Sequence, residues 1–318
     1  MLKSAAALFL LFILISPNLA PAQTPEQSAL ARSSALIKAG KAKQAQAVLA
    51  AASKAHPESE ALHAALGRLL FKQQKYEDAV QELGLALQIN PDSRENSMLL
   101  AESLIGWQHY GVAVDFLHAV QKKFGAFPEF HYDLGLAYYS LNQTKDAKSE
   151  LEEAARLAPD LDRAQYLLAA CIATEGDYAK AVEIFRKLVK DHPQNATYWV
   201  TYAQMLMRVG NENIPEALKA CRRARALKPR DLHVQYVTAT VLLQAGHFAE
   251  ARPLFERLVS VSPKELTAHV ALVRIYTQLG ERELAKQQIE IVHQIEKEAP
   301  AKPASEPPPP APDNPALN

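Results

Sequence analysis

Cysteine is nearly absent from this sequence, which has only Cys171 and Cys221 in 318 residues. A fold that depends on disulfides has more cysteines, so the packing of apolar side chains must hold this one together. Both cysteines lie on apolar faces of predicted helices. We therefore predict two free, buried thiols in preference to a disulfide bridge between them.

An excess of charge of one sign is also missing, because 35 lysines and arginines balance 35 aspartates and glutamates. Proteins that bind nucleic acid or anionic membranes by electrostatic attraction carry a basic field, which this chain lacks. The balance disfavours both of these partners and leaves a protein or a peptide as the expected one.

Long hydrophobic runs are confined to the N-terminus, where an unbroken apolar run spans Ala5–Ile15. The run follows a lysine and precedes the small residues Ala20 and Ala22, which is the anatomy of a signal peptide. It is shorter than the roughly 20 apolar residues that cross a bilayer. We predict a signal peptide over residues 1–22, export to the periplasm or the secreted space, and no stable membrane insertion. An uncleaved N-terminal anchor is the alternative.

Motifs of catalysis and metal binding are missing as well. The sequence has no HExxH pair, no glycine-rich phosphate loop and no GxSxG elbow, and we predict no enzyme, no catalytic residue and no cofactor. Three histidines, His63, His131 and His269, share one place in a repeating pattern. Whole repeats separate them, so they cannot meet at one metal ion, and we interpret them as partly exposed helix residues.

The residues that break helices recur with a period of 34 residues. Prolines recur with steps of 34, 68, 34, 36 and 34 residues, and Gly125 fills the skipped place, where a glycine can end a helix as a proline does. The prolines of this series are Pro57, Pro91, Pro159, Pro193, Pro229 and Pro263.

A second series consists of alanines, spaced by 34 residues except for one step of 36. Its members are Ala45, Ala79, Ala113, Ala147, Ala181, Ala217, Ala251 and Ala285. Between them, large apolar residues recur every three or four positions, which is the helical spacing. Each unit is therefore predicted to be a pair of helices that approach closely at small residues and bury their apolar faces against neighbouring units.

Two units carry the pattern most clearly. One has Trp199, Tyr202, Ala203, Leu206, Ala217, Ala224 and Pro229, and another has Leu168, Ala169, Ile172, Tyr178, Ala181, Phe185 and Pro193. In these residues the sequence resembles the tetratricopeptide-repeat family, whose unit is 34 residues long. The resemblance implies an all-α fold, a right-handed α-solenoid of about eight antiparallel helix pairs. We place this array at residues 23–297 and expect a disordered, proline-rich tail over residues 298–318.

The resemblance also implies a binding surface, because the first helices of such repeats line a concave groove. Transferring this register residue by residue predicts a peptide-binding groove of Arg68, Phe71, Lys72, Met98, Glu102, Tyr132, Asp133, Tyr139, Arg163, Tyr166, Gln204, Met207, Arg208 and Tyr236. Family members that hold the C-terminal carboxylate of heat-shock chaperones use asparagines and lysines in this groove. The corresponding places here include Asp133, so that clamp is absent. For any one tyrosine of the set, packing against neighbouring turns is an equal alternative.

The expected function is a non-catalytic scaffold or adaptor that binds a peptide or a helix of a partner protein in this groove. The alternative is a structural component of a cell-envelope complex that docks through its convex face or its ends. Fold-level resemblance does not choose between these two roles.

Overall fold

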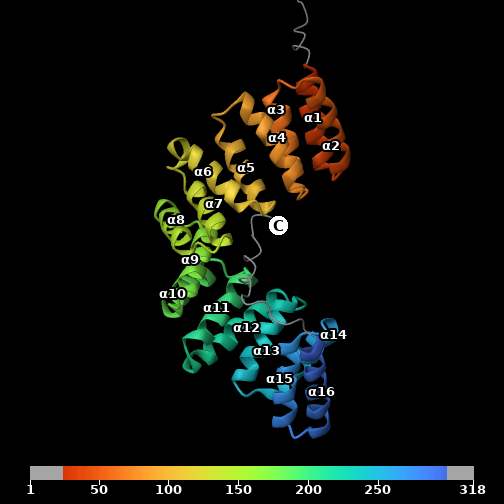
Figure 1. Ribbon diagram of the computed structural model, residues 1–318, viewed down its shortest axis with the longest axis vertical. Helices are drawn as coiled ribbons and strands as arrows, with labels where there is room; N and C mark the ends of the chain where they lie inside the picture. Colours follow the sequence, from red (N-terminus) through yellow and green to blue (C-terminus); the bar gives the residue numbers. More distant parts are fainter. Residues whose placement is uncertain (1–23, 299–318) are drawn as a thin grey trace, which may run out of the picture. The chain divides into compact units, whose positions relative to one another are not determined.

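The protein is described by a computed structural model over residues 24–298 (Figure 1), in which all regular structure is helical. The helices are α1 Pro25–Lys38, α2 Ala42–Ala55, α3 Glu60–Lys72, α4 Tyr76–Ile89, α5 Arg94–Gly106, α6 Tyr110–Phe124, α7 Pro128–Ser140, α8 Thr144–Leu157, α9 Asp162–Thr174, α10 Tyr178–Asp191, α11 Ala196–Val209, α12 Ile214–Leu227, α13 Leu232–Gln244, α14 Phe248–Val261, α15 Leu266–Gln278 and α16 Arg282–Glu298. A short 3-10 helix, η1, spans Asn211–Asn213. The predicted all-α fold of about eight helix pairs is confirmed.

The predicted signal peptide and almost all of the predicted tail lie outside the described residues. The last helix, α16, ends at Glu298, one residue beyond the predicted end of the array. The chain divides into two compact units, one up to Asn96 and one from Ser97 onward, so that α5 contributes to both. We describe each unit by itself.

Small residues explain why the two helices of each pair pack closely. Every alanine of the predicted series is buried, from Ala45 in α2 to Ala285 in α16. On the facing helices, Gly67 and Gly135 leave no room for a side chain, because an added Cβ would lie 2.7 Å from the side chain of Leu83 or of Leu151. Close packing at these points lets the large apolar side chains of each pair interdigitate.

The turn inside each pair has its own recurrent geometry. In seven of the eight pairs one residue takes a left-handed φ at the same repeat position, and these residues are Gly40, Gln74, Gln108, Asn142, Gly176, Gly246 and Gly280. The exception is the pair α11–α12, where the predicted two-residue insertion is accommodated by η1 and Pro215 enters the first turn of α12. Glycine is favoured in the left-handed region, and glutamine and asparagine occupy it here at a small cost.

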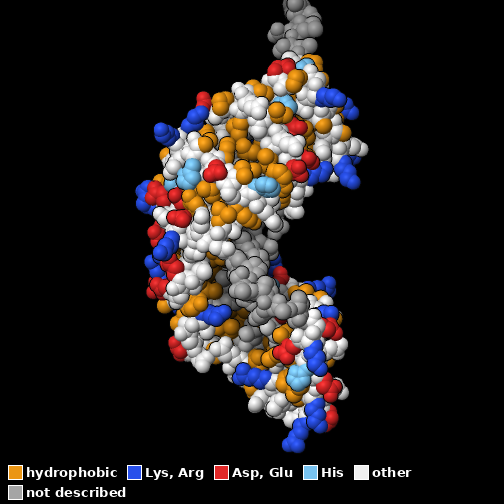
Figure 2. Space-filling view, viewed as in Figure 1, with side chains coloured by type: hydrophobic (Ala, Val, Ile, Leu, Met, Phe, Trp, Pro, Cys, Tyr) orange, Lys and Arg blue, Asp and Glu red, His pale blue; other side chains and the backbone are white. Residues whose placement is uncertain are grey.

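Within each unit, the odd-numbered helices form one layer and the even-numbered helices another. Within the first unit α1 contacts α3, and within the second unit α7 contacts α9 and α11 contacts α13. In the second unit charged side chains gather over α8 and α10, and apolar side chains are more frequent over α7 (Figure 2). We call the surface of the odd-numbered helices within each unit the odd-helix face.

Both cysteines are free and buried, as predicted. Burial raises the pKa of the Cys171 thiol to about 12, with Glu175 adding to the shift, and burial raises the pKa of Cys221 to about 11. Both thiols therefore stay protonated at neutral pH and are poor nucleophiles.

The interpretation of the three repeat histidines as partly exposed was wrong. His63, His131 and His269 are 5%, 8% and 4% exposed. The Nε2 atom of His131 lies 2.8 Å from the carbonyl oxygen of Gly125, six residues earlier, and its Nδ1 atom lies 2.6 Å from Oε2 of Glu150 on α8. Each of these histidines thus joins its first helix to the preceding turn and to its partner helix.

The same bond to the preceding turn recurs with other donors. Nε2 of Gln235 donates to the carbonyl oxygen of Pro229 at 2.8 Å, and Nε1 of Trp199 donates to that of Pro193 at 3.0 Å. These side chains occupy the repeat position of His131. Because proline or Gly125 breaks the helix just before, its carbonyl lacks a helical partner and needs a side-chain donor.

The histidine position yields a stability prediction. Replacing His131 with alanine leaves the carbonyl of Gly125 and the carboxylate of Glu150 without this partner, which we expect to cost about 1–3 kcal/mol of folding free energy. His131→Gln should lose much less folding free energy, because Gln235 shows that an amide at this repeat position can donate to the carbonyl of the preceding turn. Urea unfolding followed by circular dichroism measures the unfolding midpoint and the free energy of unfolding of the wild type and of both variants. Equal midpoints for wild type and His131→Ala would show that these bonds do not contribute.

Candidate functional site

All residues predicted to line the groove lie on odd-numbered helices. They are Arg68, Phe71 and Lys72 on α3, Met98 and Glu102 on α5, Tyr132, Asp133 and Tyr139 on α7, Arg163 and Tyr166 on α9, Gln204, Met207 and Arg208 on α11, and Tyr236 on α13. Those on α3 belong to the first unit and the others to the second. Tyr132, Asp133 and Tyr166 are buried, and the rest are half-buried or exposed.

The structure brings four of the predicted residues together in the second unit. We call Glu102, Tyr132, Asp133 and Arg163 the acidic–aromatic cluster. They come from three successive odd-numbered helices, and their charges interact strongly enough to shift the pKa of Asp133 and of Tyr132. Two carboxyl groups, a phenol and a guanidinium therefore share one small region of the odd-helix face.

Asp133 is the least ordinary member of the cluster. Its side chain is 1% exposed, and neither carboxylate oxygen has a hydrogen-bond partner among the described residues. Burial, and after it the neighbouring Glu102, raises the pKa of Asp133 well above its usual range, and Arg163 opposes the shift. The pKa of Glu102 is also raised by burial and is lowered in part by Arg163. A buried carboxylate without hydrogen bonds is energetically costly, which makes this group exceptional in the fold.

Arg163 does not pair with Asp133. Its guanidinium carbon lies 4.4 Å from the centre of the Tyr132 ring, which is a cation–π contact. Its buried Nε atom has no hydrogen-bond partner among residues 24–298. The face of Tyr132 thus holds a cation, while the oxygens of Asp133 remain available.

A second group of side chains adjoins the cluster on α9 and α11. The rings of Tyr166 and Tyr198 stack with centroids 5.5 Å apart, and the hydroxyl of Tyr198 donates to Oδ2 of Asp162 at 2.8 Å. Nδ1 of His192 lies 3.8 Å from the same oxygen. Burial, followed by the bond to Asp162, raises the pKa of Tyr198, so this phenol stays protonated.

Sequence reasoning missed Asp162 and Tyr198 as members of a site. Neither residue is among the predicted groove residues. The available signal was their separation of 36 residues, which places them at neighbouring positions on successive odd-numbered helices. An interaction one repeat apart is visible in sequence only when the period and both side chains are considered together.

The remaining predicted residues are not part of the cluster. Arg68 pairs with Glu95 at 2.9 Å, and Phe71 contacts the edge of Tyr76. The guanidinium of Arg208 lies 6.0 Å from the Tyr178 ring, and Tyr236 packs against the core that includes Phe255. These contacts stabilise local packing, and they leave Gln204 and Met207 half-buried on the face of α11.

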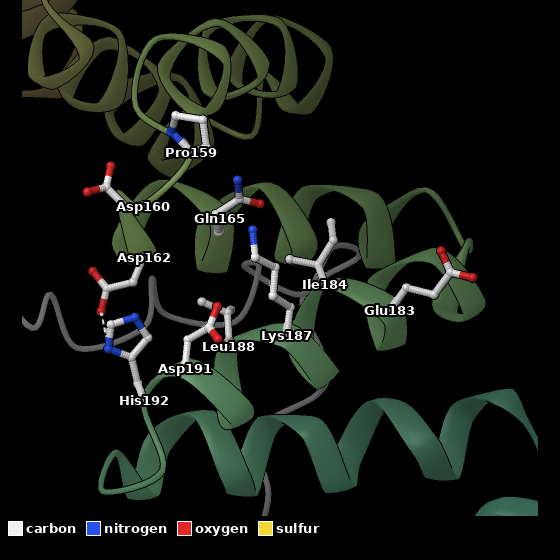
Figure 3. Close-up of a pocket in the computed structure, with 10 residues that line it drawn as sticks. All are labelled: Pro159, Asp160, Asp162, Gln165, Glu183, Ile184, Lys187, Leu188, Asp191 and His192. Carbon is white, nitrogen blue, oxygen red and sulfur yellow. Dashed lines mark ion pairs between the residues drawn. The ribbon is translucent and has the colours of Figure 1, made fainter.

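A cavity of about 600 Å³ lies beside α9 and α10 (Figure 3). Apolar side chains of Ile184 and Leu188 line it together with several carboxylates, and Asp162 lies at its edge with its ion pair to His192. The full lining is Pro159, Asp160, Asp162, Gln165, Glu183, Ile184, Lys187, Leu188, Asp191 and His192. Asp162 therefore links the cavity to the tyrosines of the odd-helix face.

The chemistry that this region can perform is limited by its protonation states. In the part of the chain that the structure describes, no group of three or more His, Cys, Asp or Glu side chains is placed to hold a metal ion. Burial raises the pKa of Tyr132, with a contribution from Asp133, so that its phenol is neutral. Hydrogen-bond acceptors, a guanidinium and aromatic faces on one surface are groups that can bind a ligand.

Asp133 generates a prediction about stability and pH. Because its folded pKa is raised, the folded state keeps a proton that the unfolded state loses above about pH 4, so stability falls as pH rises from there toward the folded pKa. Asp133→Asn should therefore stabilise the chain by about 1–3 kcal/mol at pH 7 and have little effect near pH 4.

Asp115→Asn is the matched control, since Asp115 is an exposed acid on α6 and does not act on Asp133. Thermal unfolding at several pH values between 4 and 8 measures the stability of both variants relative to the wild type. A stabilisation by Asp133→Asn that does not change with pH would contradict the assignment.

Similar proteins were found by sequence. Two models described as tetratricopeptide repeat match the chain, one at residues 132–196, 173–232 and 202–264 and the other at residues 36–103 and 242–301. Superkiller protein 3 of Schizosaccharomyces pombe is 29% identical over 104 residues, which are 33% of this chain and 7% of that protein. Cytochrome c-type biogenesis protein CycH of Rhizobium meliloti is 29% identical over 147 residues, 45% of this chain and 36% of the relative. The chain thus matches less than half the length of either relative.

Solved structures share the fold. A tetratricopeptide repeat protein from Parabacteroides merdae has a TM-score of 0.61 at 16% identity, covering 85% of this chain and 99% of that one. PilF of Pseudomonas aeruginosa has a TM-score of 0.56 at 19% identity, covering 68% of this chain and 97% of that one. The helix pairs, their period and the matches to both repeat models agree, and the chain belongs to the tetratricopeptide-repeat family.

Proposed function

We propose that the chain is a non-catalytic adaptor, exported to the periplasm or the secreted space, that binds an extended segment or a helix of a partner protein on its odd-helix face. The tetratricopeptide-repeat fold supports a scaffold for protein–protein interaction. None of the helices over residues 24–298 has the length and apolar character that crossing a membrane requires.

The observation that carries the proposal is where the contact-type residues lie. Tyrosine, methionine and arginine are enriched at protein interfaces, and here they lie on consecutive odd-numbered helices of the second unit. Within the acidic–aromatic cluster, the carboxyl oxygens of Asp133 and the Nε atom of Arg163 add hydrogen-bonding capacity that is unused within the described chain. A preorganised surface of this kind binds a partner segment without a large ordering cost on its own side.

An assembly component is the second candidate, and the cavity beside α9 and α10 favours it. Its apolar and acidic lining, most of it on or beside the even-numbered helix α10, would receive a partner there. Similarity to a relative named for cytochrome c-type biogenesis fits an assembly role. The two candidates differ in which helices the partner contacts.

The binding prediction uses peptides selected from a displayed random library on the purified chain. Gln204→Ala combined with Met207→Ala should weaken the selected peptides at least about fivefold in fluorescence anisotropy, because each lost contact contributes of order 0.5–1 kcal/mol. Both residues are half-buried on α11, so the fold should tolerate the change.

The control carries Lys219→Ala and Arg222→Ala on α12, the even-numbered partner of α11, where both side chains are exposed. Its affinity should equal that of the wild type. A loss of affinity confined to this control, or a library that yields no binder, would sink the proposal for the odd-helix face.

Export is tested separately by the mass of the mature chain. We expect protein recovered from the cell envelope or the culture medium to begin at Gln23, because the small-x-small site ends at Ala22. Intact-mass spectrometry distinguishes this chain from the full-length one. A chain that retains residues 1–22 would instead support an N-terminal anchor.

A further inference from the structure

We infer that the acidic–aromatic cluster binds the cationic side chain, a lysine ammonium or an arginine guanidinium, of the partner segment. The inference rests on the proposed function for the segment itself, and it adds the chemistry that the segment must present. Its starting point is the unused hydrogen-bonding capacity of Asp133 and Arg163.

Asp133 supplies the acceptors. Both of its oxygens are buried and without a hydrogen-bond partner in the described part of the chain, so a donor brought by a ligand would satisfy groups that the fold leaves unsatisfied. Glu102 on the neighbouring helix supplies a second carboxyl group that interacts with Asp133. A positively charged donor favours the ionised form of both carboxyl groups, so its binding releases the proton that Asp133 keeps in the free chain. Such a donor gains more from these groups than a neutral amide or hydroxyl does.

Tyr132, the aromatic residue of the cluster, already contacts a cation. The face of Tyr132 holds the guanidinium of Arg163, at 4.4 Å from its carbon to the ring centre. No ion pair among the described residues fixes Arg163, and its side chain is half-exposed. Arg163 can therefore rotate away from the ring, which would expose its buried, unpaired Nε atom as a donor for a backbone carbonyl of the incoming segment.

The charge balance points the same way. Three acidic groups, Glu102, Asp133 and Asp162, and one basic group, Arg163, act on the phenol of Tyr132, and Glu129 also acts on Asp133. One added cation compensates this excess of carboxylates, whereas an acidic side chain would increase it. Glu102 and Arg163 are half-exposed, so the cluster reaches the surface of the odd-helix face through them.

The direct test titrates the chain with the smallest suitable probe, N-acetyl-lysine N-methylamide. Its norleucine counterpart has the same chain length without the charge and serves as the matched ligand. The readout is the carboxyl carbon NMR signal of Asp133 in protein labelled at aspartate, assigned by its loss in Asp133→Asn. The lysine probe should shift this signal in a saturable manner, and the norleucine probe should leave it in place.

Variants separate a site from a general charge effect. In Asp115→Asn, which removes an exposed acid on the neighbouring helix α6, the dissociation constant of the lysine probe should change less than twofold. In Glu102→Gln it should rise about tenfold, which corresponds to the loss of one charge-assisted contact. Equal shifts by the lysine and norleucine probes, or equal affinities of these two variants, would overturn the inference.

A second arm uses the peptides selected for the proposed function. Replacing their lysine or arginine by norleucine should lower their affinity for the wild-type chain about tenfold. The same replacement should lower their affinity for Asp133→Asn much less. Peptides that bind the odd-helix face equally well without a basic residue would overturn the inference and leave the proposed function standing. If the library yields no binder, the proposed function fails, and the lysine probe alone decides whether the cluster binds cations.

Discussion

Close approach of the two helices in each pair is the constraint on which the rest of this fold depends. An α-helical hairpin of two dozen residues cannot bury its apolar face by itself, and it becomes stable only when a neighbouring pair covers that face. The buried alanines and the two glycines that face Leu83 and Leu151 set the separation at which this stacking works. A larger side chain at these points would push the helices apart and expose apolar surface in two adjacent repeats at once.

This constraint explains why the architecture could be predicted from sequence. It acts on every repeat in the same way, so small residues, helix-breaking prolines and apolar spacing all recur at 34 residues and reinforce one another. The extra two residues before Pro215 were also visible as a break in the period. Helix type and pairing are local properties, and local properties that repeat are the easiest to infer from a single chain.

Polar side chains between repeats were harder to predict, for a physical reason. A histidine on a helix looks the same in sequence whether it faces water or a broken turn, and only the packed structure shows the carbonyl of Gly125 beside His131. Gln235 and Trp199 make the same bond with different chemistry, so no residue type marks the position. Similarly, helical register located Asp133 on the binding side of its helix, but the charges that act on its carboxyl group, Glu102 on α5 and Arg163 on α9, lie on helices that are separate in sequence.

The stability of the scaffold and its use for binding are in tension at Asp133. A core that served packing alone would place an apolar or amide side chain there, because a buried carboxylate without hydrogen bonds lowers the stability of the folded state. Repeat proteins can carry such a cost, since their stability is spread over many similar interfaces and one weak point is compensated by its neighbours. The chain can therefore keep in its middle repeats a group that is unfavourable when free and favourable when a donor covers it. The free energy withheld from folding at this position is recovered on the binding that we infer, and the preference for a cation follows from the same acidic group, Asp133, that destabilises the unbound chain.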